Sequence, residues 1–338
     1  MAKKRVWVID LIKALCIVLV ILTHSANINP AMLDKTGLFY YFAVNKCVPA
    51  FLFISGFVSA MGSRRTLKSQ YKISTLAPKL LRFLIPMLTA FSIFALLGIV
   101  SGTLKGAREA ISRLLLFDFG PGSYYAAIML QFVLLAPLML RLVDKWNVKG
   151  VVIIGAVNVL YELLASFYGM DIAIYRIIMI RYFLVIALGM YFGLNRRKKP
   201  NWLCVAVLFV VGFLYIALTA TDGYTYKIFT ISPWNRSNFL AGLYVAAILY
   251  TVIRVFRKSG GNSFIGRAVS KVGQSTYHIM YTQMLYFVVR PAFDKLVFDM
   301  TTLPLWSQYA MDIVVSVLLG LVFCVADAKI FRKFYKTK

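Results

Sequence analysis

The sequence predicts an all-α, polytopic membrane protein with about ten transmembrane helices and both termini in the cytoplasm. Of its 338 residues, 61% are hydrophobic and the mean hydropathy is +0.77, whereas soluble domains average about 45–50% apolar residues. Long apolar stretches recur along the whole chain, as is typical of transmembrane helices. No connection between them is long enough for a soluble domain, so we expect a single transmembrane domain over residues 1–338.

Ten expected spans follow one another from the amino terminus. They cover residues 6–28, 38–60, 76–101, 122–143, 149–168, 172–194, 201–220, 237–256, 273–291 and 306–328. With a cytoplasmic amino terminus, 24 of the 38 lysines and arginines lie in cytoplasmic ends and loops, and 8 lie in outer loops. This bias is the positive-inside rule and predicts a multi-pass protein of a bacterial cytoplasmic membrane. It explains the net charge of +26 without nucleic acid as a partner.

Several segments support these boundaries. Asp10 and Lys13 interrupt the first apolar run, which argues against a cleaved signal peptide. Segment 102–121 mixes charged and apolar residues, so we expect it to lie as a helix on the outer leaflet. We find no long-range repeat of the kind seen in transporters. The four cysteines fall inside spans without metal-ligand spacing, so no metal is expected.

The first span carries three ionisable residues on one helical face. An α-helix turns about 100° and rises about 1.5 Å per residue. Lys13 and His24 are therefore separated by roughly three turns plus 20° and by ~16 Å, and Asp10 lies within about 60° of both. A charge at the bilayer centre costs about 2.5–3.5 kcal/mol, so this face should line a protein interior or a wet cavity.

His24 is the leading candidate for a catalytic residue. An intramembrane ionisable residue beside other such groups indicates function, although a histidine bonded to a neighbouring helix is the simpler alternative. A neutral imidazole can take a proton from a hydroxyl as that oxygen attacks an acyl group. Glu162 and Asp312 lie at suitable depth to orient the ring, and the sequence does not choose between them. His278 is the less favoured of the two histidines.

Cations at the inner ends of the first and third spans indicate an anionic ligand. Lys79 and Arg82 lie within an apolar run near the inner surface, at the level of Lys13. A polyphosphate bound there, with a thioester arm reaching His24, would fit acyl-coenzyme A. The alternative for Lys13 is an intrahelical pair with Asp10 that lowers the insertion cost.

Polar and aromatic residues at the outer ends are candidates for binding an acceptor or for orienting groups. Glu162 and Arg176 lie at matching depth and form either a buried ion pair or part of a sugar site. Gln283 lies five residues from His278, so only one of the two need face a cavity. The aromatic residues either belong to the interfacial belt or stack on sugar rings; they are Tyr124, Tyr125, Tyr224, Tyr226 and Trp234.

Five motifs resemble the acyltransferase-3 family of integral membrane acyltransferases. IDLIKALCIVLVILTHS resembles its first helix, with Lys13, ten residues and then His24, and Asp10 at the usual acidic position. FLFISGF resembles the second helix and contains Ser55. KLLRFLIP resembles the basic motif with Lys79 and Arg82. SYYAAIMLQFVLLAP and VGQSTYHIMYTQ resemble the fourth and the penultimate helix.

The resemblance implies ten core helices, transfer from cytoplasmic acyl-coenzyme A to a sugar hydroxyl on the outer side, and His24 as the catalytic residue. It groups Ser55 with Lys13, Lys79 and Arg82 as acyl-coenzyme A ligands. Lys13 and Lys79 stand where arginine is commoner, which keeps the charge but loses the bidentate fork. Gln283 stands where the penultimate helix often carries histidine.

We therefore expect a membrane O-acyltransferase with acetyl- or succinyl-coenzyme A as co-substrate. Its acceptor would be a polysaccharide of the cell envelope or a lipid-linked glycan. The sequence leaves open whether the protein forms a homodimer. The main alternative is a polysaccharide or glycolipid exporter or flippase of similar architecture. A scaffold is the third, and six cationic residues within the spans make it the least favoured.

Overall fold

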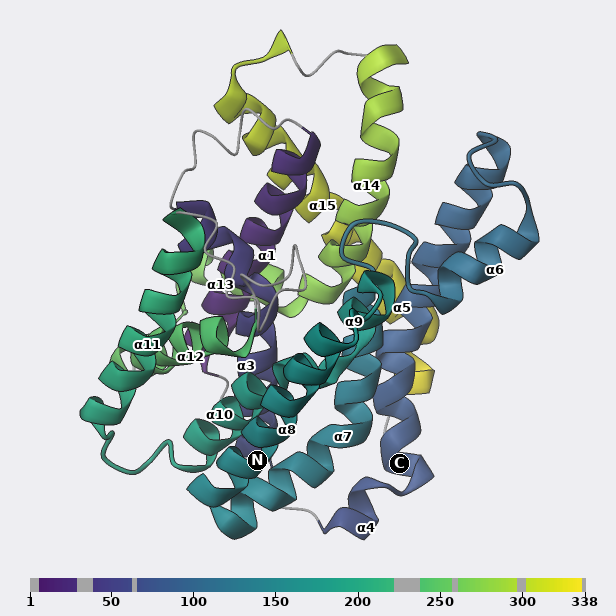
Figure 1. The fold of residues 1–338 in the computed structure, drawn as a ribbon. Helices are drawn as coiled ribbons and strands as arrows, with labels where there is room; N and C mark the ends of the chain where they lie inside the picture. Colours follow the sequence, from purple (N-terminus) through teal and green to yellow (C-terminus); the bar gives the residue numbers. More distant parts are fainter. Residues whose placement is uncertain are drawn as a thin grey trace. The chain divides into compact units, whose positions relative to one another are not determined.

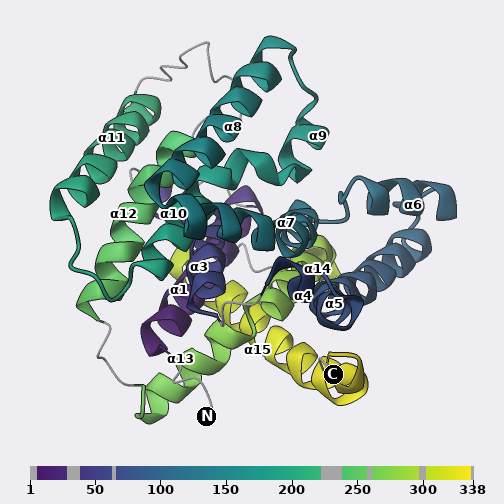
Figure 2. The same ribbon diagram turned by 90° about the horizontal axis from the view of Figure 1, so that it is seen from below.

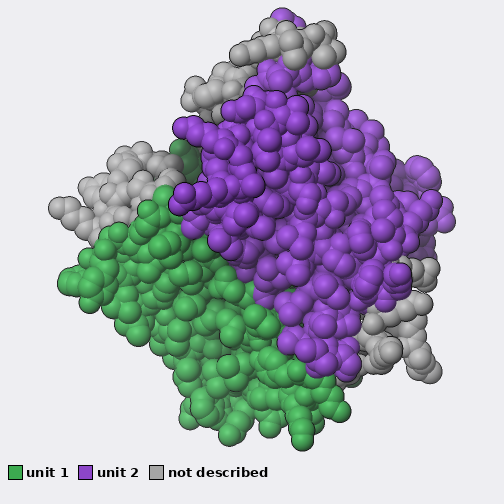
Figure 3. Space-filling view, turned by 90° about the vertical axis from the view of Figure 1, so that its right-hand side faces the viewer, with its two compact units in different colours: residues 1–9, 38–72, 131–260 green, residues 10–37, 73–130, 261–338 purple. Residues whose placement is uncertain are grey.

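The structure is a computed structural model that describes residues 6–28, 39–62, 66–221, 238–256, 261–296 and 302–335. All regular elements in these ranges are helices (Figure 1). The chain forms two compact units, coloured in Figure 3. Unit 1 comprises residues 1–9, 38–72 and 131–260, and unit 2 comprises residues 10–37, 73–130 and 261–338. The single domain over residues 1–338 stays a prediction.

Unit 1 is built around the apolar helix α10, which packs against α3, α8 and α12 (Figure 2). Glycines allow α3 and α10 to approach closely, because a Cβ on Gly189 would overlap the Phe53 carbonyl and one on Gly56 would overlap that of Ile186. Small residues are common at such membrane helix interfaces. The helices of this unit are η1 (Val44–Lys46), α3 (Cys47–Met61), α4 (Leu67–Gln70), α8 (Val148–Phe167), α9 (Ile172–Ile177), η2 (Met179–Tyr182), α10 (Phe183–Leu194), α11 (Trp202–Thr221), α12 (Phe239–Val255) and most of α7 (Tyr124–Trp146).

The expected span 172–194 is not one helix. The backbone is extended at Ile178, with φ −87° and ψ 123°, and this separates α9 from η2 and α10. Gln131 of α7 bonds the backbone on both sides of the break. Its amide nitrogen donates to the Ile177 carbonyl at 2.6 Å, and its amide oxygen accepts from the Met179 N–H at 3.1 Å. The break therefore leaves these two backbone groups satisfied inside an apolar environment.

Unit 2 contains α14 and α15 packed side by side, with α5 and α13 against α14. Two glycines bring its helices together: a Cβ on Gly273 of α13 would overlap the Asp10 carbonyl of α1, and one on Gly320 of α15 would overlap Ile279 of α14. Its helices are α1 (Trp7–Ile28) from Asp10 onward, α5 (Ile73–Val100), α6 (Ala107–Leu115), the start of α7, α13 (Phe264–Gln274), α14 (Thr276–Leu296), α15 (Leu305–Phe331) and η6 (Arg332–Tyr335).

Seven helical segments of the described chain are long and apolar enough to cross a membrane, so this is a multi-pass membrane protein. They are Trp7–Ala26, Phe39–Met61, Ile73–Val100, Tyr124–Trp146, Val148–Phe167, Trp202–Thr219 and Leu305–Phe331. Shorter apolar helices cover Met179–Leu194 and Phe239–Val255. The count of ten and the cytoplasmic termini stay predictions. The segment 102–121 contains the helix α6, and α13 lies largely between the expected spans 237–256 and 273–291.

Candidate functional site

His24 lies in unit 2 near the end of α1 and is partly buried. Its ring centre is 6.2 Å from that of Phe287 on α14. Its Nε2 faces Gly122, where a Cβ would lie 3.4 Å from that nitrogen. Gly122 has a φ of +86°, a conformation that favours glycine, so this side of the imidazole is kept free of a side chain. Nδ1 is buried and has no hydrogen-bond partner among the described residues.

Next to His24, the Ser25 hydroxyl donates to Oδ2 of Asp312 on α15. Tyr286 of α14 donates to Oδ1 of the same carboxylate at 2.7 Å, and Nη1 of Arg290 donates to Oδ2 at 2.6 Å. Ser25 and Asp312 are fully buried, and Arg290 is 1% exposed. Arg290 also lies 3.6 Å from the carboxylate of Asp294. Asp312 therefore accepts a hydrogen bond from Ser25, the neighbour of His24. It does not bond Nδ1 of the His24 ring, so it does not orient the imidazole through that nitrogen.

Gln283 is fully buried in α14, one turn before Phe287. Neither its amide oxygen nor its amide nitrogen has a hydrogen-bond partner in the part of the chain that the structure describes. A buried amide without partners is costly and rare. A bound polar molecule is one way to satisfy it.

Several other predicted ligands lie in the same unit as His24. Asp10 is 3% exposed, and Lys13 is partly buried one turn further along α1. Lys79 is partly buried on α5, whereas Arg82 is exposed and its Nη2 donates to the Tyr335 carbonyl at 3.0 Å. Tyr124 is partly buried at the first residue of α7. The structure thus gives Arg82 a protein partner that the sequence did not indicate.

His278 belongs to a separate polar cluster of unit 2. Its Nε2 lies 3.1 Å from Oδ2 of Asp327, and Tyr335 donates to Oδ1 of the same carboxylate at 2.6 Å. Its imidazole is therefore bonded within the protein, in contrast to Nδ1 of His24.

The other predicted site residues, Ser55, Glu162 and Arg176, belong to unit 1. The Ser55 hydroxyl donates to the Phe51 carbonyl of its own helix at 2.8 Å. Glu162 is 2% exposed and accepts a hydrogen bond from Tyr175 at 2.6 Å. Its electrostatic partner is Arg181. Of the two alternatives for Glu162 and Arg176, the ion pair is therefore not formed in the described structure.

Arg181 completes this second buried cluster. Its guanidinium carbon lies 4.4 Å from the centre of the Tyr175 ring and 4.7 Å from that of Tyr182, which are cation–π distances. Tyr161 stacks on Tyr175 with ring centres 5.9 Å apart. Oε1 of Glu162 has no hydrogen-bond partner among the described residues. Tyr224, Tyr226 and Trp234, the other expected sugar-stacking residues, lie outside the described residues.

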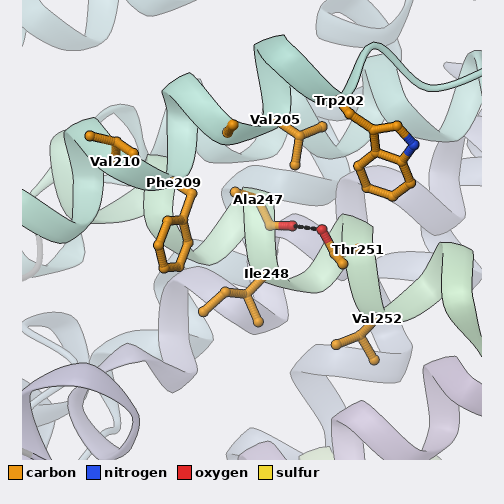
Figure 4. A pocket seen from close by; sticks show the side chains of 9 residues that line it. Trp202, Val205, Phe209, Val210, Ala247, Ile248, Thr251 and Val252 are labelled. Atoms are coloured by element: carbon orange, nitrogen blue, oxygen red, sulfur yellow. Dashed lines mark hydrogen bonds between the residues drawn. The ribbon is translucent and has the colours of Figure 1, made fainter.

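A groove of about 380 Å³ lies between α11 and α12 in unit 1 (Figure 4). Its lining is apolar apart from Thr251, whose hydroxyl donates to the Ala247 carbonyl at 2.9 Å. It contains none of the predicted site residues and offers no group for acid–base chemistry. The groove is therefore not the candidate site.

The sequence missed the partners of Asp312. Arg290 gave a signal, since it is a cation at the end of an apolar run. Ser25 and Tyr286 gave none, because a serine and a tyrosine are ordinary residues near a membrane interface.

Comparison with known proteins adds the family. The family model described as an acyltransferase domain matches residues 6–326, a range that covers nearly the whole chain and contains the five motifs. No curated protein and no solved structure matches. Because the match covers well over half of the sequence, this multi-pass membrane protein belongs to the acyltransferase-3 family.

Proposed function

We propose that the chain is a membrane O-acyltransferase that moves an acetyl or succinyl group from cytoplasmic acyl-coenzyme A to a glycan hydroxyl. The acceptor would be a cell-surface polysaccharide or its lipid-linked precursor at a bacterial cytoplasmic membrane. The observation that carries the proposal is the geometry at His24. A partly buried imidazole presents Nε2 to Gly122, a residue without a side chain, and His24 lies in the stretch that resembles the family's first helix.

The reaction needs one base that later acts as an acid. Nε2 of His24 takes the proton of the acceptor hydroxyl as its oxygen attacks the thioester carbonyl carbon. When the tetrahedral intermediate collapses, the carbon–sulfur bond breaks and the imidazolium returns the proton to the departing thiolate. The products are the ester and free coenzyme A, and the imidazole is neutral again.

The proposed ligands divide between the two substrates. Lys13, Lys79 and Arg82 would bind the phosphates of acyl-coenzyme A, with Ser55 assigned by the family resemblance alone. Arg82 would exchange its bond with the Tyr335 carbonyl for a stronger, charge-assisted bond to phosphate. Glu162, Arg176 and Tyr124 are proposed for the acceptor, Asp10 for orienting Lys13, and Gln283 for a polar substrate group near His24.

The test is transfer by the purified protein. Labelled acetyl- or succinyl-coenzyme A is incubated with candidate glycans, and free coenzyme A and labelled glycan are measured. We expect His24→Ala to lower turnover by at least about a hundredfold, as loss of a general base does. The matched control is His278→Ala, which removes the imidazole paired with Asp327 and should keep turnover within about threefold.

Two results would contradict the proposal. Unchanged turnover in a folded His24→Ala protein would remove the assignment of the base. Movement of glycan across vesicle membranes without release of coenzyme A would favour the alternative, an exporter or flippase.

A further inference from the structure

We infer that the buried Asp312–Arg290 pair is a positioning site for His24 that acts through the Ser25 hydroxyl. The inference rests on the proposed function, because it concerns the residue that would act as the base. It assigns no contact with substrate to Asp312, Arg290 or Ser25.

The first argument is the matching of neighbours on two helices. Ser25 and His24 are consecutive on α1, and Tyr286 and Phe287 are consecutive on α14. Ser25 and Tyr286 both bond Asp312, while His24 and Phe287 contact each other with ring centres 6.2 Å apart. One turn of α1 and one turn of α14 therefore carry both the polar network and the ring contact. A rotation of α1 that broke the Ser25–Asp312 hydrogen bond would also move the His24 ring relative to Phe287.

The second argument is that Asp312 does not need Ser25 to be satisfied. Its Oδ1 accepts from Tyr286, and its Oδ2 already accepts a charge-assisted bond from Arg290. A buried carboxylate requires such pairing, and these two donors supply it. The bond from Ser25 is additional, and its distinct effect is to tie α1 to α15 beside His24.

The third argument is the lack of another fixed hydrogen bond on the ring. Nδ1 of His24 has no partner among the described residues, so the usual carboxylate or carbonyl that fixes a catalytic imidazole through this nitrogen is missing. Without a hydrogen bond on Nδ1, the position of the imidazole depends on the position of α1, so α1 itself must be fixed by a bond to another helix. Ser25 is the residue adjacent to His24 that makes a bond to another helix.

The test compares two hydroxyl residues that flank His24. Ser25→Ala removes the link to Asp312, whereas Thr23→Ala removes a hydroxyl that donates only within α1, to the Leu19 carbonyl at 3.0 Å. We expect Ser25→Ala to lower kcat about tenfold with KM for both substrates within about twofold, because misplacing a catalytic group affects the chemical step. Thr23→Ala should leave kcat within about twofold.

A second variant breaks the same link from the Asp312 side, so the test does not depend on whether Ser25→Ala folds. Asp312→Leu combined with Arg290→Met removes both charges together, and with them the oxygen that accepts the Ser25 hydrogen bond. It should lower kcat at least as much as Ser25→Ala, and adding Ser25→Ala to it should lower kcat no further, since the link is already lost.

The outcomes separate the two hypotheses. If His24→Ala retains turnover, the proposed base and its positioning site are both wrong. If His24→Ala loses turnover but Ser25→Ala keeps a wild-type kcat, the positioning role alone is overturned. The positioning role is also overturned if adding Ser25→Ala to the variant at Asp312 and Arg290 lowers kcat further by the full Ser25→Ala factor. It is overturned as well if Ser25→Ala changes KM and leaves kcat unchanged.

Discussion

At the scale of single residues, Gln283 is the least expected side chain in unit 2. It is fully buried with both amide atoms unpartnered in the described structure. Gln308 on α15 is a useful contrast, since it is 2% exposed and its amide nitrogen donates to the Leu303 carbonyl at 2.9 Å. One buried glutamine is thus bonded by the protein, whereas the other has no hydrogen-bond partner among the described residues.

We predict opposite changes in stability for Gln283→Leu and Gln308→Leu. Gln283→Leu removes an unsatisfied amide, so the thermal midpoint in detergent should stay equal or rise. Any increase in the free energy of unfolding should be about 1 kcal/mol. Gln308→Leu leaves a carbonyl without its donor and should lower the free energy of unfolding by about 1–3 kcal/mol. If Gln283 bonds a substrate, Gln283→Leu should also lower acyl-transfer turnover at least about tenfold.

The combination of readouts decides the role of Gln283. A variant that is both less stable and fully active would show that the amide is a structural group with partners inside the protein. Thermal unfolding followed by tryptophan fluorescence and release of free coenzyme A give the two measurements on one preparation.

The residue scale also shows how far sequence reasoning reached. The spacing of Asp10, Lys13 and His24 predicted one face of α1, because helical geometry is fixed by sequence separation. Partners on other helices were not predictable, since nothing local specifies which helices are neighbours. Glu162 therefore bonds Tyr175 and interacts with Arg181, where Arg176 had been considered, and Ser25 bonds Asp312 from 287 positions away.

At the scale of elements, the expected spans correspond to helices because hydropathy reports burial in lipid directly. The exception is residues 172–194, where the apolar run gave no sign of the break at Ile178. The signal lay elsewhere, in Gln131, a polar residue deep inside another span. Its amide replaces the backbone bonds lost at the break.

Glycine packing between α3 and α10 leads to a second prediction. A Cβ on Gly189 would overlap the Phe53 carbonyl, which is backbone and cannot rotate away. Gly189→Ala should therefore force the helices apart and lower the free energy of unfolding by about 1–3 kcal/mol. The matched control is Gly155→Ala on α8, where the new Cβ would meet only the end of the Leu184 side chain at 3.0 Å.

The control should be neutral or slightly stabilising, because alanine favours a helix over glycine by about 1 kcal/mol and a leucine terminus can move. Thermal midpoints of the two variants in the same detergent provide the comparison. Equal destabilisation by Gly155→Ala and Gly189→Ala would contradict the close backbone approach at Gly189.

At the scale of the whole molecule, an even or odd number of membrane crossings decides whether the two termini lie on the same side of the membrane. Seven described segments qualify by length and composition alone. The remaining expected spans correspond to η2 with α10, to α12 and to α14. In unit 1, α10 and α12 are extensively buried by neighbouring helices. Helix α14 carries Arg290, whose charge is paired with Asp312. Helices surrounded by protein need not meet the length and polarity that lipid demands.

We therefore predict ten crossings and two cytoplasmic termini. An odd number such as seven would place the ends on opposite sides. A fluorescent protein that matures only in the cytoplasm, fused in turn to each end, should fluoresce in both fusions. A cysteine introduced by Arg108→Cys on α6, in a background without the four native cysteines, should react with an impermeant thiol reagent in intact cells, whereas Lys198→Cys should react only after permeabilisation. Fluorescence from one end only would exclude an even number of crossings. If that end were the carboxyl terminus, the cytoplasmic route by which acyl-coenzyme A is proposed to reach Lys13 would be excluded as well.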